Sequence, residues 1–318
     1  MIHRPMIDRR SLLGAAAALL LPPGIAAAQE VKEFRVGFQK TGVLVIARQQ
    51  GILERRLAKR DISVKWVEFT AGPPLMEAMN VGSIDIGAVG DSPPIFAQAA
   101  GAAIVYVAGG PINNGQGIAV KADSPIKTLA DLKGKRIGFT RGSSAHNVVI
   151  ATLEKAGLTY SDITPTYLSP ADAGAAFARN SIDAWAVWDP FLAIAEQAHK
   201  ARILVNASEV AKTYSFYIAN RNFATRHPAI LRDALDGLAE AANWADANRD
   251  AVAKALAQVT GVNIEAQTLA ANRATFPFGK VTPEIVEAQQ QIADRYQKLG
   301  LIPKPIVVRQ AVWIEPQS

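Results

Sequence analysis

The 318-residue sequence contains no cysteine. Disulfides, thiolate metal sites, cysteine nucleophiles and a lipid-modified cysteine are therefore excluded. The sequence also lacks an apolar run of about 20 residues, the length needed to span a bilayer. Its 34 Lys and Arg and 28 Asp and Glu form no run of five like charges. The net charge of +6 therefore gives little indication of nucleic acid or a membrane surface as partner, but it is compatible with a small anionic ligand.

Patterns typical of catalysis are missing as well. His146, His199 and His227 have no metal-like spacing, and no HExxH motif is present. Ser143 and Ser144 are not part of a G-x-S-x-G elbow, and the glycines form neither a dinucleotide fingerprint nor a phosphate loop. We therefore expect a protein that is not an enzyme, with no catalytic residues, no metal and no cofactor.

What is present is ordinary globular composition, with 49% hydrophobic and 19% charged residues. At about 150 residues per domain, the length suggests two domains. Before them, Arg9 and Arg10 precede an apolar run at 12–21, and three alanines follow at 26–28. This pattern predicts an export signal over residues 1–28, of the twin-arginine type. An ordinary signal with two arginines remains the alternative.

The chain alternates short β-like runs with helical stretches, which is typical of α/β proteins with largely parallel sheets. The predicted strands are 34–38, 62–69, 84–89, 136–139, 163–168 and 183–187. The predicted helices are 44–57, 73–81, 144–156, one from Pro170, long Ala-rich helices from Pro228 and a last one over 285–298.

An internal repeat divides this pattern into two halves. Residues 83–91 align with residues 181–189 at an offset of 98 and are identical at six of nine positions. Residues 36–40 match 137–141 at an offset of 101. Chance similarity of two amphipathic segments is the alternative, but two homologous lobes explain both offsets.

We accordingly expect a fold with two lobes, each built on a mixed, mostly parallel sheet, and a ligand cleft between them. Lobe 1 would comprise residues 29–122 and 219–318, including the C-terminal helices, and lobe 2 residues 123–218. The crossovers would fall near 120–127 and 217–221. Ligands of open parallel sheets bind beyond the carboxyl ends of strands. The loops there are 39–42, 90–93, 141–147 and 188–190. Four helix N-termini at one cleft would attract a small anion.

Several motifs, in their order along the chain, resemble those of a known family. Distinctive blocks are Gly90-Asp91-Ser92-Pro93 through Gln98 and Trp185-Ala186-Val187-Trp188-Asp189-Pro190; further blocks are Gly37-Phe38-Gln39-Lys40, Gly142 through Asn147 and Ser215-Phe216-Tyr217. From residue 34 to 313, the sequence resembles the periplasmic aliphatic-sulfonate-binding proteins of ABC importers. That family is a branch of the type II periplasmic-binding-protein fold, which also includes nitrate, taurine and thiamin-precursor binders.

The resemblance and the loop positions together suggest a set of ligand-binding residues. The candidates are Gln39, Gly90, Asp91, Ser143, Ser144, His146, Asn147, Trp188, Asp189, Ser215 and Phe216. Each has a structural alternative. Ser143 and Ser144 could simply cap a helix. Asp91 and Asp189 could cap helices or recognise an amine on a zwitterionic ligand. Trp188 could pack in the core rather than line the pocket, and Gln39 could face solvent.

The function implied by the resemblance is import of aliphatic sulfonates, with a small organic sulfonate anion and an inner-membrane ABC permease as partners. The protein would be a periplasmic monomer that binds no nucleic acid. Rival ligands are taurine, nitrate and a thiamin-pyrimidine precursor. A small-molecule enzyme on the same fold is the alternative from a different class, although the pyrimidine-synthesising relatives use cysteine and histidine clusters that this sequence lacks.

Overall fold

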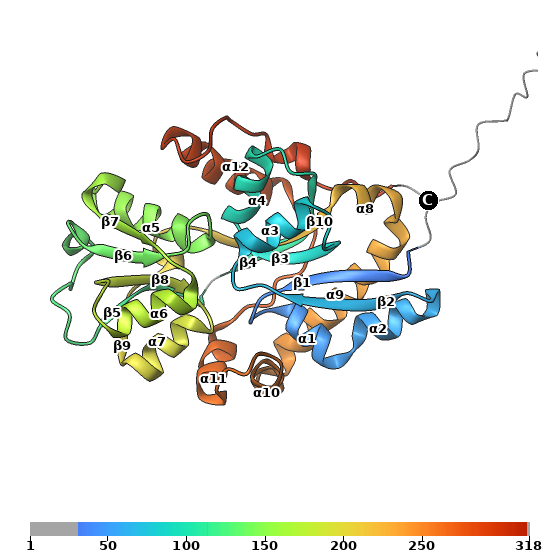
Figure 1. Cartoon of the computed structure of the whole chain (residues 1–318), viewed down its shortest axis with the longest axis horizontal. Helices are drawn as coiled ribbons and strands as arrows, with labels where there is room; N and C mark the ends of the chain where they lie inside the picture. The colour runs from blue at the N-terminus through green and yellow to red at the C-terminus, as the bar shows by residue number, and fades with distance from the viewer. Residues whose placement is uncertain (1–30, 113, 317–318) are drawn as a thin grey trace, which may run out of the picture. The chain divides into compact units, whose positions relative to one another are not determined.

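The computed structural model describes residues 31–112 and 114–316 (Figure 1). The predicted export signal, residues 1–28, lies outside the described residues. From Lys32 onward the chain forms one unit built on two five-stranded sheets.

The first sheet has the strand order β2-β1-β3-β10-β4. Its strands are β1 (Glu33–Phe38), β2 (Ser63–Glu68), β3 (Ile86–Gly90), β4 (Ile104–Ile112) and β10 (Thr213–Asn220). β2, β1 and β3 are parallel, and β10 runs antiparallel to both of its neighbours. The sheet is therefore mixed, with one reversed strand that enters from the other half of the molecule.

The second sheet repeats this order as β7-β6-β8-β5-β9. Its strands are β5 (Gln116–Lys121), β6 (Arg136–Phe139), β7 (Thr164–Tyr167), β8 (Ala184–Trp188) and β9 (Ala201–Asn206). Here β5 is the reversed strand, antiparallel to β8 and β9. The expected fold class, two mixed and mostly parallel sheets in a two-lobed binding-protein fold, is confirmed.

Helices surround both sheets, as Figure 1 shows. They are α1 (Val43–Gln50), α2 (Ile52–Leu57), α3 (Gly72–Asn80), α4 (Ser92–Ala99), α5 (Ser144–Lys155), α6 (Pro170–Ala178), α7 (Phe191–His199), α8 (Arg221–Arg226), α9 (Pro228–Ala247), α10 (Arg249–Thr260), α11 (Ile264–Arg273) and α12 (Pro283–Lys298). Short 3₁₀ helices are η1 (Ala58–Arg60), η2 (Leu129–Leu132), η3 (Tyr160–Asp162), η4 (Ala207–Glu209) and η5 (Val308–Ala311).

The single helix expected over 44–57 is divided into α1 and α2 by Gly51. Gly51 adopts φ 61°, a left-handed conformation that glycine tolerates without steric cost. Its N–H donates to the carbonyl of Arg48 at 3.1 Å, which ends α1, and α2 starts at the next residue. The apolar periodicity continues across this break, so periodicity alone does not reveal it.

Two of the C-terminal helices, α9 and α12, pack on the first sheet from both sides, whereas α11 packs against α7 of the second lobe. α12 buries Ile285, Ile292 and Tyr296 in one cluster with β3, β4, β10, α3 and α4. α9 lies against α1 and α2 on the other face. Because both faces are covered, strand β1, which lies between β2 and β3, is buried along most of its length, as parallel sheets require.

The chain passes between the sheets twice. It leaves the first sheet at Ile112 and enters the second at Gln116, and it leaves the second at Asn206 and returns at Thr213. Both passages lie before the crossovers expected near 120–127 and 217–221. The reason is that each reversed strand, β5 and β10, belongs to the sheet that the chain is entering.

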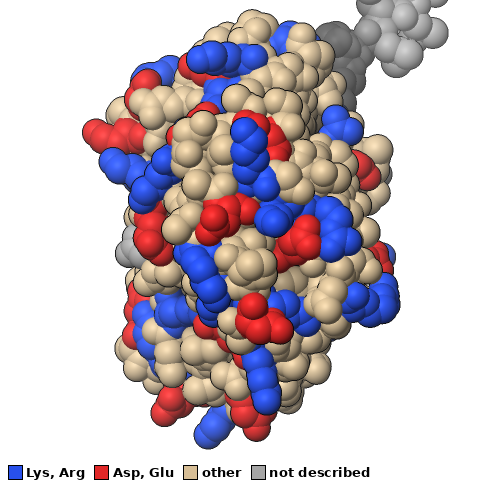
Figure 2. All heavy atoms as spheres, turned by 90° about the vertical axis from the view of Figure 1, so that its left-hand side faces the viewer, with Lys and Arg blue, Asp and Glu red and all other residues tan. Residues whose placement is uncertain are grey.

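The face that carries the second sheet and its helices has charges of both signs interspersed (Figure 2). This face therefore offers no single-sign field that could steer an anion. Over the described ranges, no helix is both long and apolar enough to cross a membrane.

Candidate ligand-binding cleft

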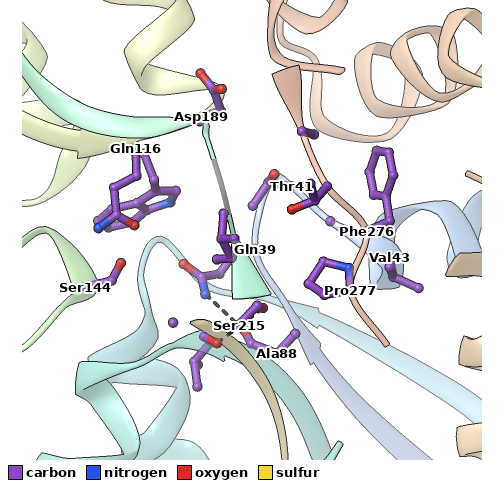
Figure 3. Close-up of a pocket in the computed structure, with 18 of the residues that line it drawn as sticks. Gln39, Thr41, Val43, Ala88, Gln116, Ser144, Asp189, Ser215, Phe276 and Pro277 are labelled. Carbon is purple, nitrogen blue, oxygen red and sulfur yellow. Dashed lines mark hydrogen bonds between the residues drawn. The ribbon is translucent and has the colours of Figure 1, made fainter. Parts of the chain in front are cut away.

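A cleft of about 1080 Å³, part of it open to solvent, lies between residues of the two sheets. All four loops expected at the strand ends contribute to its lining: Gln39, Thr41 and Gly42; Gly90 and Pro93; Ser143 and Ser144; Trp188 and Asp189. Figure 3 shows the labelled side chains converging on this space from elements far apart in the sequence. The structure therefore brings together the two halves of the repeat at one site.

Seven of the candidate residues line the cleft: Gln39, Gly90, Ser143, Ser144, Trp188, Asp189 and Ser215. Four others lie outside its lining: Asp91, His146, Asn147 and Phe216. Gln39 is held by a bond from its Nε2 to the carbonyl of Ala88 at 3.1 Å, drawn in Figure 3.

Phe216 lies in the core because strand side chains alternate between the two faces of a sheet. Its neighbours on β10, Ser215 and Tyr217, line the cleft, whereas Phe216 is fully buried and packs edge-on against Tyr106 at 5.0 Å. Phe216 is expected from the sequence to be among the ligand-binding residues, but its side chain lies on the face of β10 that points away from the cleft.

Asp91 and Asn147 form a buried joint between the lobes. Asn147 Nδ2 on α5 donates to Asp91 Oδ2 at 3.1 Å, and Ser92 Oγ donates to Oδ1 at 2.7 Å. Arg295 on α12 donates to Asn147 Oδ1 at 2.9 Å. Burial raises the pKa of Asp91 to about 6 because a carboxylate removed from water disfavours its charged form.

His146 lies in the same interior contact, next to the rings of Phe139 at 5.1 Å and Tyr296 at 5.7 Å. Its Nδ1 accepts a bond from the N–H of Gly142 at 3.3 Å. Burial lowers the pKa of His146 to about 4, with a further contribution from Arg141, so the ring is neutral near pH 7. A neutral histidine enclosed by aromatic rings acts in packing here.

Asp189 is both a helix cap and half of an ion pair. Its Oδ1 accepts from the N–H of Ala193 at 3.1 Å, and Arg273 donates to both carboxylate oxygens at 2.7 Å. Arg273 also reaches Glu196 at 2.7 Å. Both oxygens of Asp189 are therefore occupied, which disfavours the alternative that this carboxylate recognises a ligand amine.

The N-termini of α1 and α5 approach the cleft from different lobes. Gly42 and Val43 of the first, and Ser143 and Ser144 of the second, line it. Neither helix has a side-chain cap, whereas α12, whose first turn is not in the lining, is capped by Thr282. First-turn N–H groups lack partners within a helix and lie at the positive end of its dipole. Together they make an anion-binding geometry.

The two serines of α5 differ in what their hydroxyls do. Ser143 Oγ donates to the carbonyl of Thr140 at 2.7 Å, so its proton is engaged, and it does not cap the helix. Ser144 Oγ has no such bond to any residue of the described chain, and it lines the cleft. Of these two serines, Ser144 is therefore the one whose hydroxyl is available to a ligand.

A glycine is required where the end of β3 meets the start of α5. A Cβ on Gly90 would lie 2.7 Å from the Cβ of Ser144, which is closer than such atoms approach. Gly90 ends β3 and Ser144 begins α5, so this contact brings the two lobes together in the lining of the cleft.

The rest of the lining is largely apolar and includes residues that the sequence analysis did not single out. Trp188 lies at the mouth of β8 and packs edge-on against Phe191 at 6.4 Å. The additional lining residues include Val43, Leu44, Ile112, Gln116, Tyr217, Leu256, Ala270, Phe276 and Pro277. Phe276 and Pro277 follow α11, and no motif in their neighbourhood indicates a site.

Charge is scarce in this space. Among the described residues that line the cleft, Asp189 alone is charged, and Arg273 compensates it. Nor do the described residues contain three His, Asp or Glu arranged to hold a metal. An anion here would be held by neutral N–H and O–H donors and helix dipoles.

Comparison with known proteins shows which family the sequence belongs to. A family model described as NMT1/THI5 like matches residues 42–252. The chain belongs to this NMT1/THI5-like family. It is also 40% identical over 312 residues to an Escherichia coli (strain K12) protein named for binding aliphatic sulfonates, a match that covers 96% of this chain and 97% of that protein.

Two solved structures extend the likeness to the fold. One is the periplasmic aliphatic sulphonate binding protein SsuA from Escherichia coli, with a TM-score of 0.82, 40% identity and coverage of 90% of this chain and 94% of that one. The other is the alkanesulfonate-binding protein SsuA from Xanthomonas axonopodis pv. citri bound to MOPS, with a TM-score of 0.84, 40% identity and coverage of 89% and 99%.

The NMT1/THI5-like match includes most of the cleft. The N-termini of α1 and α5, together with Trp188 and Ser215, fall within residues 42–252. Gln39 precedes that range, and Phe276 and Pro277 follow it. The relatives similar over nearly the whole chain cover these parts as well.

Proposed function

We propose that this protein is the extracytoplasmic binding component of an ABC importer and that its cleft takes aliphatic sulfonates. It acts in the periplasm after export by the signal at residues 1–28, as a monomer that delivers the ligand to an inner-membrane permease. The names of the relatives that match over nearly the whole chain support this proposal.

The observation that carries it is the pairing of the uncapped N-termini of α1 and α5 with an apolar wall and no cation in the described lining. Neutral donors suit a singly charged oxyanion, and the surfaces of Trp188 and Phe276 suit an alkyl tail. Inorganic sulfate would bring a second charge and a fourth oxygen that the apolar wall would have to desolvate. Sulfonates should therefore bind more tightly than sulfate.

Taurine would bring an ammonium group into the same space. The Asp189 carboxylate is held by Arg273 through both oxygens, so the described lining has no free carboxylate for that ammonium. We infer that unsubstituted alkanesulfonates are preferred to taurine. Nitrate has no alkyl group to contact the apolar wall. A neutral pyrimidine has no negative charge to interact with the N-termini of α1 and α5.

A thermal-shift screen tests the proposal, because a ligand that binds the native state raises its melting temperature. The screen contains alkanesulfonates of increasing chain length, taurine, sulfate, nitrate and aminopyrimidines. We expect alkanesulfonates to give the largest shifts. A largest shift with any of the other compounds would contradict this assignment.

Mass spectrometry of the bound ligand separates a binding protein from an enzyme. We expect the sulfonate to be recovered unchanged after prolonged incubation, since the described cleft combines no nucleophile with a base. Recovery of a desulfonated or hydroxylated product would favour the enzyme alternative.

A further inference from the structure

Gln116 lines the cleft with a buried side-chain amide. It is the first residue of β5, where the chain enters the second sheet, and only 3% of its surface is exposed. It lines the cleft, and Figure 3 draws it on the same side as Ser144. Its Nε2 has no hydrogen-bond partner among the described residues.

An unpaired buried amide costs free energy, and the great majority of buried polar side-chain atoms in proteins have a partner. A few other buried side-chain atoms in the described chain also lack one, such as His146 Nε2 and Trp185 Nε1. None of those residues belongs to the cleft lining, whereas Gln116 does. The partner that Gln116 lacks can therefore be supplied by a molecule in the cleft.

The repeat gives Gln116 a counterpart in the other lobe. Gln116 pairs with Trp188 across β5 and β8, and Ser215 pairs with Gly90 across β10 and β3. Trp188 and Gly90 occupy equivalent repeat positions, so Gln116 and Ser215 stand at matching places on the two reversed strands. Both side chains line the cleft, but Ser215 Oγ has a weak bond to the carbonyl of Val89 at 3.4 Å. The unpaired donor is on the second lobe.

We propose that Gln116 Nε2 donates a hydrogen bond to an oxygen of the bound sulfonate, on the side of the cleft where Ser144 begins α5. This assignment rests on the proposed function and adds a residue to it. Because the amide is neutral, it supplies a donor without a charge, which favours a singly charged oxyanion over sulfate. Gln116 is also the first residue of β5 after the chain passes into the second sheet, so this bond attaches the ligand to the end of a crossover.

Gln116→Leu separates this role from a structural one. The change removes the donor and replaces it with an apolar group of similar volume. We expect the Kd for an alkanesulfonate, measured by calorimetry, to rise about 10- to 150-fold, the range for losing a hydrogen bond to a charged group. The melting temperature of the ligand-free protein should stay the same or rise, because an unpaired donor has been removed.

Gln290→Leu is the matched control. Its amide is fully engaged, donating to Asp294 at 2.8 Å and to the carbonyl of Ile306 at 2.9 Å, and accepting from the N–H of Val308 at 2.9 Å. It lies outside the cleft lining. This variant should melt at a lower temperature and keep the wild-type Kd.

Gln116→Glu provides a second test that keeps the shape of the side chain. A carboxylate beside the oxyanion accepts instead of donating and repels it, so the Kd should rise more than in Gln116→Leu. If wild-type protein binds the sulfonate and both Gln116 variants keep its Kd, the role of Gln116 is overturned while the proposed function stands. If wild-type protein binds no sulfonate, the proposed function itself is contradicted.

Discussion

The two lobes share an ion pair of nearly identical geometry. In the first, Arg35 donates to Asp85 from its backbone N–H at 2.8 Å and from its guanidinium Nη2 at 2.6 Å. In the second, Arg136 makes the same bonds to Asp183 at 2.8 and 2.7 Å. One pair ties β1 to the turn before β3, and the other ties β6 to the turn before β8. This shared geometry supports the repeat that the sequence offsets indicate.

The lobes differ at the ends of their equivalent strands, where residues face the cleft. Gly90 of the first lobe corresponds to Trp188 of the second, and Val43 at the start of α1 corresponds to Ser144 at the start of α5. Asp91 has no arginine in direct contact in the described structure, whereas its counterpart Asp189 is held by Arg273. Burial raises the pKa of both carboxyl groups. The repeat thus preserves the scaffold and varies the strand ends that face a ligand.

The largest effect should come from breaking the Asp189 pair. Arg273→Met keeps the aliphatic stem but leaves the Asp189 carboxylate buried, which typically costs about 3–5 kcal/mol. Denaturant unfolding should show this loss, and adding Asp189→Asn should restore much of it. Arg232→Met, at an exposed pair with Glu315, is the control and should cost at most about 1 kcal/mol. Equal losses of unfolding free energy in Arg273→Met and Arg232→Met would refute the distinction between a buried and an exposed ion pair.

Asp91 is a buried carboxylate without a contacting arginine among the described residues, so its ionised form destabilises the folded state. Its pKa is raised from 3.8 to about 6, so the penalty is absent below about pH 4 and complete above about pH 6. The difference in unfolding free energy between Asp91→Asn and wild type should therefore rise by about 2 kcal/mol from pH 4 to pH 7.

Only this slope tests the Asp91 prediction, because the lost bond to Asn147 shifts the difference equally at every pH. His146, with a pKa lowered to about 4, changes stability in the opposite direction over the same range, but it is present in both proteins and cancels. A difference that does not vary with pH would show that Asp91 ionises freely in the folded protein.

The repeated arginine pairs should differ in energy despite their shared geometry. Asp85 is almost completely buried, with 2% of its side chain exposed, whereas Asp183 is 31% exposed. Arg35→Met should cost about 1.5–3 kcal/mol, the range for hydrogen bonds to a buried charged group. Arg136→Met should cost less, because water solvates the abandoned Asp183. A larger loss for Arg136→Met in urea unfolding would reverse this order.

The two α5 serines provide the finest distinction. Ser144→Ala removes a free hydroxyl from the cleft and should raise the Kd for an alkanesulfonate about tenfold, which is about 1.4 kcal/mol. Ser143→Ala removes a bond to Thr140 and should mainly lower stability. Calorimetry and unfolding on both variants test this. A greater loss of affinity in Ser143→Ala would show that Ser143 is the contact.

Much of this architecture is predictable from the sequence because it depends on local signals. The parallel strands end near the positions that alternation predicts, and Gly90, Ser144, Trp188 and Asp189 meet at one cleft because strand ends in such sheets converge. The repeat offsets locate these loops without any knowledge of tertiary packing.

The remaining features depend on tertiary contacts. The reversed strands β5 and β10 are defined by their antiparallel neighbours, and the passage into β5 holds Gln116. Arg273 pairs with Asp189, which lies 84 residues away in the sequence. Asp91 and Asn147 turn to each other at the lobe joint instead of toward the cleft. No local pattern encodes these pairings.

Calorimetric titration of wild-type protein with a linear alkanesulfonate, and in parallel with inorganic sulfate, tests the central claim most directly. The account predicts one saturable site per chain for the sulfonate and weaker binding of sulfate, because neutral donors and an apolar wall line the cleft. Sulfate binding as tight as that of the sulfonate, or no sulfonate binding at all, would contradict it.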